Sequence, residues 1–475
     1  MARRLDGAVS SVGRASRLHR EGRRFEPVTA HQCSGITSRL GIQIHRRSAR
    51  DRLEEALARI ADPDGEGART ILTSYRDAAR EAADAADKRA RDGVGLGPLD
   101  GAIVSIKDLF DVAGEPTRAG SRVLADAPPA TNDAPVVQRL REAGAVIVGK
   151  TNMSEFAFTG VGMNPHYGTP GNPADRTRVP GGSSSGAGVS AADGMCEIAI
   201  GTDTGGSTRI PAALCGVVGF KPTKSRVPTD GAYPLSPTLD SVGPLASSVE
   251  ACANADAVLA GSEPWAFEPA QLERRRLGIL KGEPLSELDA IVSSRFETAL
   301  AALSHAGARL ADAHIPALED MARVHEATTI ATAEAYRIHE AQIAARGEHY
   351  DPFIRRRIEG GRAASDADLA EMLAERGKLA RAMDARMAEF DALILPTTPI
   401  VAPAMAELRS DEAFKQANRL LLRNTAIANF YDLCAISLPI PGDGLPVGLM
   451  LFGRHGHDRQ LFAIAAAVER LFQAA

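Results

Sequence analysis

The spacing of apolar residues predicts that helices and strands alternate along most of the chain. Apolar positions recur every three or four residues over 49–61 and 70–92, which predicts two helices. A short apolar run at 102–106 predicts a buried strand. A helix over 133–143 and a second buried strand over 145–148 follow. This strand–helix–strand order indicates a sheet covered by helices.

The second half of the chain continues the same pattern with longer helices. Residues 287–390 are rich in Ala, Arg and Glu and are predicted to be mostly helical. An apolar run at 391–396 predicts a strand that returns to the core. Two more strands are expected at 435–439 and 447–452, and a closing helix at 458–473.

The chain divides into an atypical leader and one large domain. Residues 48–475 contain no repeat, heptad pattern or interdomain linker, so a single domain is the simplest organisation. Residues 1–47 are basic and lack both an apolar period and the hydrophobic region of a secretory signal. Codons for residues 10–15 and 24–27 can spell the D-arm and T-arm of a transfer RNA gene. Our hypothesis is that residues 1–32 are such a gene read as protein; the alternative is a disordered basic leader.

Composition narrows the class of protein. The chain has 475 residues, 44% hydrophobic and 24% charged, which is typical of a globular enzyme. The net charge of −5 argues against nucleic-acid binding, and no apolar run approaches the ~20 residues that span a membrane. The five cysteines have no CxxC spacing, which favours reduced thiols in a cytoplasmic protein over disulfides or a zinc site. They are Cys33, Cys196, Cys215, Cys252 and Cys434.

Two segments rich in Gly, Ser and Thr contain the candidate chemistry. Residues 180–186 read Pro-Gly-Gly-Ser-Ser-Ser-Gly, and 201–212 read Gly-Thr-Asp-Thr-Gly-Gly-Ser-Thr-Arg-Ile-Pro-Ala. Acyl transfer requires an activated nucleophile and hydrogen-bond donors directed at the developing oxyanion. The glycines before Ser207 allow backbone N–H groups to converge on a substrate carbonyl, so Ser207 is a candidate nucleophile. No Gly-Lys-Ser/Thr follows, so a nucleotide-binding loop is not expected.

These segments resemble the core of the amidase signature family. The family core reads GGSS(G/S)G followed by G(T/S)DTGGSxRxPA, with a lysine at the end of an earlier strand. Ser183 and Ser207, 24 residues apart, match this core, and Lys107 ends the predicted strand at 102–106. The resemblance extends from about residue 48 to the C-terminus. Further matching segments lie at 149–157, 215–222 and 444–449.

The resemblance implies both a fold and an activity. The implied fold is α/β, with a large mixed twisted sheet covered by helices on both sides. The implied activity is hydrolysis of a small carboxamide or ureido C–N bond through an acyl-enzyme on Ser207, with release of ammonia or an amine. Ser183 would transfer the proton, and Lys107 would be the base, which a lysine can be only when burial keeps it neutral. The oxyanion hole would consist of the N–H groups of Thr204, Gly205, Gly206 and Ser207.

Other residues near the motifs are expected to support this site. The family pattern includes a cis peptide between Gly182 and Ser183. Ser184 is expected to make hydrogen bonds within its loop, and Asp203 is expected to pair with Arg209 and brace the second loop. Neither a metal nor a cofactor is implied, and the histidines 166, 455 and 457 have no expected role. Candidates for a substrate pocket, or alternatively for plain core, are Phe156, Phe158, Met163 and Tyr167.

Other readings of the same residues are possible. Residues 182–186 also match GxSxG, which would make Ser184 the nucleophile of an α/β-hydrolase esterase, with His455 and Asp432 or Asp443. That elbow requires a preceding strand, whereas residues 172–177 are polar and loop-like. A cysteine nucleophile and a non-catalytic binding protein are less favoured, because all three triad positions are filled.

An alternative inside the family is the glutaminase-type A subunit of a tRNA-dependent amidotransferase. Those proteins resemble SSNLARYDGVRYG after the core, whereas residues 331–339 here read Ala-Thr-Ala-Glu-Ala-Tyr-Arg-Ile-His, which favours a stand-alone amidase. The expected partner is a small-molecule amide, with neither nucleic acid nor membrane involved. A homodimer is compatible with the resemblance, and the identity of the amide stays open.

Overall fold

The structure is a computed structural model that describes residues 47–263, 265 and 268–474. By its internal contacts, residues 47–475 form one compact unit. The predicted leader, except Arg47, and the transfer RNA hypothesis for residues 1–32 lie outside the described residues. No helix in the described ranges is both long enough and apolar enough to cross a membrane.

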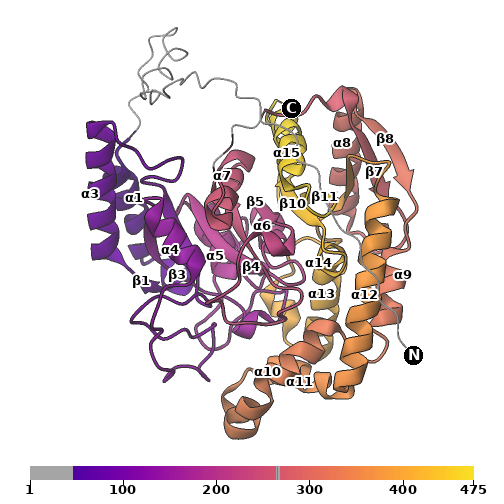
Figure 1. The fold of residues 1–475 in the computed structure, drawn as a ribbon, viewed down its shortest axis with the longest axis horizontal. Helices are drawn as coiled ribbons and strands as arrows, with labels where there is room; N and C mark the ends of the chain where they lie inside the picture. Colours follow the sequence, from indigo (N-terminus) through magenta and orange to yellow (C-terminus); the bar gives the residue numbers. More distant parts are fainter. Residues whose placement is uncertain (1–46, 264, 266–267, 475) are drawn as a thin grey trace, which may run out of the picture. The chain divides into compact units, whose positions relative to one another are not determined.

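One mixed sheet of eleven strands organises the described residues, in the order β1-β3-β2-β4-β6-β5-β10-β11-β9-β7-β8 (Figure 1). Strand β2 is parallel to β3 and β4, and β7 is parallel to β8 and β9. The other pairs are antiparallel. The strands are β1 Ile71–Ser74, β2 Ile103–Lys107, β3 Val146–Thr151, β4 Ile198–Asp203, β5 Val218–Lys221, β6 Ser241–Ala246, β7 Arg276–Leu280, β8 Arg309–Ala313, β9 Ala392–Pro396, β10 Cys434–Pro439 and β11 Gly448–Gly453.

Helices pack against both faces of this sheet. The α-helices are α1 Ala49–Ala61, α2 Gly67–Thr70, α3 Arg76–Asp92, α4 Pro135–Glu142, α5 Ser185–Ala192, α6 Arg209–Cys215, α7 Val249–Ala260, α8 Ala290–His305, α9 Ala317–Val324, α10 Ile330–Arg346, α11 Pro352–Glu359, α12 Asp366–Arg386, α13 Asp411–Arg423, α14 Ala426–Phe430 and α15 Asp458–Gln473. The mixed sheet with helices on both sides confirms the predicted fold class.

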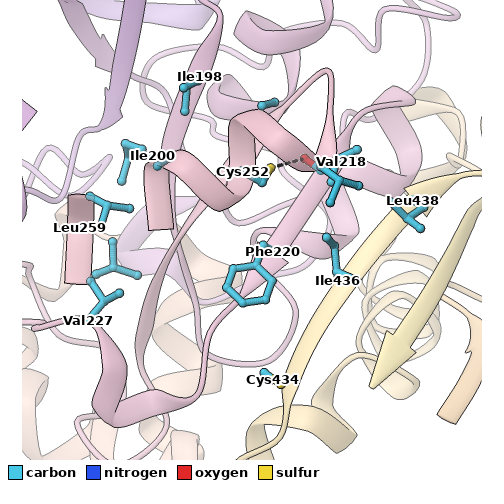
Figure 2. Packing of buried hydrophobic residues seen from close by; sticks show 14 of the residues in the cluster. Ile198, Ile200, Val218, Phe220, Val227, Cys252, Leu259, Cys434, Ile436 and Leu438 are labelled. Carbon is cyan, nitrogen blue, oxygen red and sulfur yellow. Dashed lines mark hydrogen bonds between the residues drawn. The ribbon is translucent and has the colours of Figure 1, made fainter. Parts of the chain in front are cut away.

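Side chains along β2 point alternately to the two faces of the sheet and show which helices cover each face. Ile103 belongs to a buried cluster with residues of α1, α3, α5 and α6. Val104 and Ile106 point the other way, into a cluster with residues of α4, α7 and α15. Figure 2 shows this second cluster, where Phe220 of β5 lies among aliphatic side chains from neighbouring elements. Phe220 also stacks on Phe462 of α15, with the ring centroids 4.2 Å apart.

The structure corrects the sequence prediction in two places. Residues 70–92 are not one helix, because Ile71–Ser74 forms β1, which pairs antiparallel with β3 before α3 begins at Arg76. Residues 287–390 also contain a strand, β8 Arg309–Ala313, which pairs with β7. Both strands are short and lie at the sheet edges, so backbone pairing rather than an apolar period defines them. The predicted helices at 49–61 and 458–473 are confirmed.

The same alternation places the lysine of β2. Ser105 and Lys107 share the Ile103 side of the strand, and Ser105 Oγ lies 3.0 Å from Ser190 Oγ of α5. Lys107 therefore faces the N-terminal end of α5, where the first serine-rich motif enters the helix.

Candidate active site

Lys107 is a fully buried lysine at the carboxyl end of β2. Its Nζ donates hydrogen bonds to Ser183 Oγ and to Thr202 Oγ1, each over 2.8 Å. Burial lowers the pKa of Lys107 to about 7, although the carboxylates of Asp203 and Asp240 act in the opposite direction. A substantial fraction of neutral lysine is therefore present near neutral pH.

Ser183 is held in the loop that precedes α5. The Gly182–Ser183 peptide bond is cis, as the family pattern predicts. The loop is fixed on both sides, because Gly182 N donates to Gly160 O and Ser154 N donates to Ser183 O. A Cβ on Gly182 would lie 2.7 Å from Gly162 N, so this close packing requires glycine. The Ser183 side chain is consequently buried and directed at Lys107.

Ser207 lies in the loop between β4 and α6. Gly206 has φ of 138°, and a Cβ there would lie 2.1 Å from Thr425 Oγ1, so only glycine fits. Ser184 N donates to Ser207 O over 3.3 Å, which joins the two serine-containing loops directly. Ser207 is 4% exposed and reaches a cavity in the protein.

The loop that carries Ser207 presents unused backbone donors. Within the described part of the chain, the N–H groups of Thr204, Gly205, Gly206 and Ser207 donate to no acceptor. Consecutive free N–H groups in a glycine-rich turn form a concave site for an anion. The arrangement is therefore suited to hold an oxyanion next to Ser207 Oγ.

Asp203 and Arg209 form a buried ion pair that braces this loop, as the sequence predicts. Arg209 Nη2 donates to Asp203 Oδ1 over 2.8 Å and Nε donates to Oδ2 over 3.1 Å, and neither side chain is exposed. Asn429 Nδ2 also donates to Asp203 Oδ1. Burial alone would raise the pKa of Asp203, but the Arg209 guanidinium holds that pKa well below its usual range. The pair fixes the end of β4 to the start of α6.

Thr202 and Asp240 belong to this site and were missed by the sequence analysis. Thr204 Oγ1 donates to Asp240 Oδ1 over 2.5 Å, while Leu235 N and Ser236 N donate to Oδ2 over 3.0 Å each. Burial raises the pKa of Asp240 to about 6. Thr202 could have been found, because it lies in the same motif as Ser207; no motif marks Asp240.

The cavity at Ser207 has a volume of about 670 Å³. Its walls come from the Ser207 loop, from Phe158 and its neighbours, and from α9, α11, α13 and α14. Of the predicted pocket residues, the structure brings Phe158 to this cavity but not Met163 or Tyr167. Met163 packs against an apolar cluster around Val161, and the Tyr167 hydroxyl donates to Ser121 O.

The fourth pocket candidate, Phe156, also lies away from the cavity. Its ring packs in the core against Tyr233, His339 and Tyr350, with centroids 4.3 to 5.4 Å away. The residues from the helices that sequence analysis did not connect with the site are Leu318, Met321, Phe353, Arg356, Arg357, Lys415, Asn418, Arg419, Leu422, Arg423, Ala426, Asn429 and Phe430.

Known proteins share this sequence pattern and this fold. The sequence profile described as "Amidase" matches residues 51–462. The chain belongs to the amidase family. A solved amidase structure superposes with a TM-score of 0.81 at 34% identity, covering 90% of this chain and 97% of the other. As an amidase-family member, the protein is a hydrolase that acts on C–N bonds.

Several amidase-family proteins are similar over most of their length. A 2-amino-5-chloromuconic acid deaminase of Comamonas testosteroni is 38% identical, covering 83% of this chain and 86% of the relative. A 1-carboxybiuret hydrolase subunit of Pseudomonas sp. (strain ADP) is 35% identical, covering 86% and 92%. The A subunit of a glutamyl-tRNA(Gln) amidotransferase of Chloroflexus aurantiacus (strain ATCC 29366 / DSM 635 / J-10-fl) is also 35% identical, covering 85% and 89%.

The geometry does not favour the other nucleophiles considered for this amidase. Ser184 Oγ donates to Thr202 O, and residues 172–177 before it form no strand. His455 is exposed and lies beside Asp432, and in the described ranges neither contacts Ser184. The cysteines that the structure describes do not line the cavity, and burial raises the pKa of each thiol. Those cysteines are Cys196, Cys215, Cys252 and Cys434.

The remaining histidines have structural neighbours. His166 Nε2 lies 2.7 Å from Glu155 Oε1, and His457 Nδ1 lies 2.9 Å from Gln460 Oε1. Across the described ranges, no group of three or more His, Cys, Asp or Glu side chains is arranged to hold a metal ion.

Proposed function

We propose that this protein hydrolyses the C–N bond of a small carboxamide or ureido compound, with Ser207 as nucleophile, Ser183 as proton carrier and Lys107 as base. The observation that carries this proposal is the buried hydrogen bond from Lys107 to Ser183. It lies beside the loop in which Ser207 and the three residues before it have free backbone N–H groups. A base, a proton carrier, a nucleophile and an oxyanion site are the parts that acyl transfer requires.

The first half of the reaction forms an acyl-enzyme. Ser207 Oγ attacks the carbonyl carbon and gives its proton to Ser183, whose own proton passes to neutral Lys107. The negative charge that develops on the carbonyl oxygen accepts hydrogen bonds from the N–H groups of residues 204–207. The proton then returns through Ser183 to the substrate nitrogen, the C–N bond breaks, and ammonia or an amine leaves.

The second half removes the acyl group, with water in place of Ser207 as the nucleophile and the same proton route through Ser183. A water molecule enters where the amine left and gives a proton to Ser183, which passes one to Lys107. The resulting hydroxide attacks the ester carbonyl, and the oxyanion is again held by the backbone donors. Collapse of this intermediate returns the proton to Ser207 Oγ and releases the acid.

The similar proteins support C–N chemistry and point to acidic substrates. The deaminase relative is named for a muconic acid and the hydrolase relative for a carboxybiuret. A glutaminase-type A subunit is the second candidate, because the A subunit of an amidotransferase is as similar to this chain as the carboxybiuret hydrolase relative.

Ammonia release from a panel of amides, ureas and glutamine tests the proposal. Wild-type protein is expected to release ammonia from at least one simple amide or ureido compound without a partner protein, and Ser207→Ala is expected to reduce that rate at least ~10³-fold. Undiminished release by Ser207→Ala contradicts the assignment of the nucleophile. Release from glutamine alone, and only after a partner protein is added, favours the second candidate.

A further inference from the structure

Arg357 is a cationic side chain on the cavity wall that is not paired with a carboxylate in the described part of the chain. It belongs to α11, and its Nη1 donates to Phe158 O over 2.8 Å. Its guanidinium also lies over the Phe158 ring, 4.3 Å from the centroid. The side chain is thus held at two points by the same cavity-lining residue.

The other arginines on the cavity wall each lie within ion-pair distance of a carboxylate, although Arg419 and Arg423 share one. Arg356 pairs with Asp411, and Arg419 and Arg423 both pair with Glu287. Lys415 is exposed to solvent. Arg357 is therefore distinguished among these cations by being both partly buried and without a counter-charge.

Arg357 keeps donors free for a ligand. Its Nε and Nη2 have no hydrogen-bond partner among the described residues, yet they are not enclosed by protein. Burial lowers the pKa of Arg357 to about 10, which leaves the side chain charged at neutral pH. Because a partly desolvated cation without a partner is unfavourable, an anion that enters the cavity gains a charge-assisted hydrogen bond there.

The rest of the wall gives no matching site for a cation. Glu283 is the one cavity-lining carboxylate in the described ranges, and it is exposed. His325 also lines the cavity, and burial lowers its pKa to about 4, so it is neutral at neutral pH. Apolar side chains on the wall include Leu235, Leu239, Leu318, Met321, Leu422 and Phe430.

We infer that the substrate is an amide whose acyl part carries a carboxylate, bound by Arg357, and that it has no ammonium group beside that carboxylate. This inference rests on the proposed function, because it takes the cavity at Ser207 to be the acyl site. It deepens that function by separating carboxylated amides from two other classes, neutral amides and amino-acid amides such as glutamine. An ammonium group would have to be desolvated against apolar wall without a buried counter-charge.

Three compounds test the inference directly. Glutaramate differs from pentanamide by a carboxylate in place of a methyl group, and glutamine differs from glutaramate by an added ammonium group. Wild-type kcat/KM is expected to be at least ~10-fold higher for glutaramate than for either other compound, because hydrogen bonds to charged groups are strong. The comparison is repeated with one, two and four methylenes, using malonamate, succinamate and adipamate with their neutral analogues, so that the best spacer is identified.

Variants of α11 identify the residue responsible. Arg357→Gln is expected to raise KM for the best carboxylated amide ~10- to 100-fold and to leave the neutral analogue within ~3-fold, which also shows that the variant is folded. The KM of Arg357→Lys for the carboxylated amide should lie between the values for wild type and Arg357→Gln, because a lysine keeps the charge but not the forked geometry. Arg355→Gln is the matched control, because it removes the same charge from the same helix, whereas Arg355 pairs with Glu359 and does not line the cavity.

Two outcomes overturn the inference. One is a wild-type preference for the neutral member of every pair, and the other is an equal loss on both members in Arg357→Gln. Failure of the proposed function is seen separately, as activity retained by Ser207→Ala or no hydrolysis of any compound. In that case the anion site is tested by binding alone. Calorimetry measures the binding of glutarate and the other dicarboxylate products to Ser207→Ala, with and without Arg357→Gln. Binding that Arg357→Gln leaves unchanged, or no binding at all, contradicts an anion site at Arg357.

Discussion

The Nζ atom of Lys107 lies 2.8 Å from Ser183 Oγ and donates a hydrogen bond to it, although the lysine side chain has no exposure to solvent. In water a lysine is almost fully protonated at neutral pH and cannot accept a proton. Burial at the end of β2 brings its pKa to about 7 and makes it available as a base. The relationship between these two residues therefore connects the position of a strand to the chemistry proposed for Ser207.

The first prediction concerns the pH dependence of kcat/KM. Because the neutral form of Lys107 is required, kcat/KM should rise with pH through about 7 and then level off. Below that value it should fall about tenfold per pH unit as the lysine becomes protonated. Initial rates from about pH 5 to 9 measure this, with return to about pH 8 as a control for inactivation. A flat profile, or an ascending limb near the ordinary lysine pKa, would contradict the role of Lys107.

The second prediction concerns Asp240. Its charge raises the pKa of Lys107, so Asp240→Asn should move the ascending limb to lower pH, by about one unit or less. The rate on the plateau should also fall, because an amide nitrogen cannot accept the N–H groups of Leu235 and Ser236.

A neighbouring carboxylate supplies the control for Asp240. Glu334 is buried and accepts hydrogen bonds from Ser236 and Thr238, but it does not act on the pKa of Lys107. Glu334→Gln should therefore disturb the same loop without moving the limb. An equal displacement of the limb in both variants would show that Asp240 acts only through the loop.

The motif residues that the sequence singled out lie together in the structure, whereas most of the predicted pocket residues do not line the cavity. Lys107, Ser183, Ser207 and the Asp203–Arg209 pair all belong to contiguous motifs, and the structure brings them together. Strand alternation along β2 explains why Lys107 faces α5, since Ser105 and Lys107 share one face. The positions of these residues depend on local backbone geometry, and motifs and strand alternation predict that geometry.

The residues of the cavity wall could not be predicted from contiguous motifs. Arg357 and Asn418 lie on helices far from the motifs in sequence, and no periodicity says which helix face meets the cavity. Phe156 and Tyr167 lie close to Phe158 in the sequence, yet the Phe156 ring packs in the core and the Tyr167 hydroxyl donates to Ser121 O. Proximity in sequence was therefore a poor guide to the pocket. Much of the pocket wall comes from α9, α11, α13 and α14, which lie more than 100 residues after Ser207 in the sequence.

The third prediction concerns the stability of the loop. Arg209→Met should lower the free energy of unfolding by about 3–5 kcal/mol, because it leaves the buried Asp203 carboxylate without its cation. Urea denaturation followed by circular dichroism measures the change. The double variant Asp203→Asn/Arg209→Met should recover part of the loss, since no unpaired charge remains. A single-variant loss within ~0.5 kcal/mol would show that the pair does not brace the fold.

The position of the acyl group on the enzyme tests the central claim most directly. A reaction with the best amide is quenched in acid during turnover, and tandem mass spectrometry of the digested protein locates any added acyl mass. The added mass is expected on Ser207 and is expected to be absent from Ser207→Ala treated in the same way. An acyl group on Ser184 or on a cysteine, or the same adduct in Ser207→Ala, would contradict the assignment of Ser207 as nucleophile.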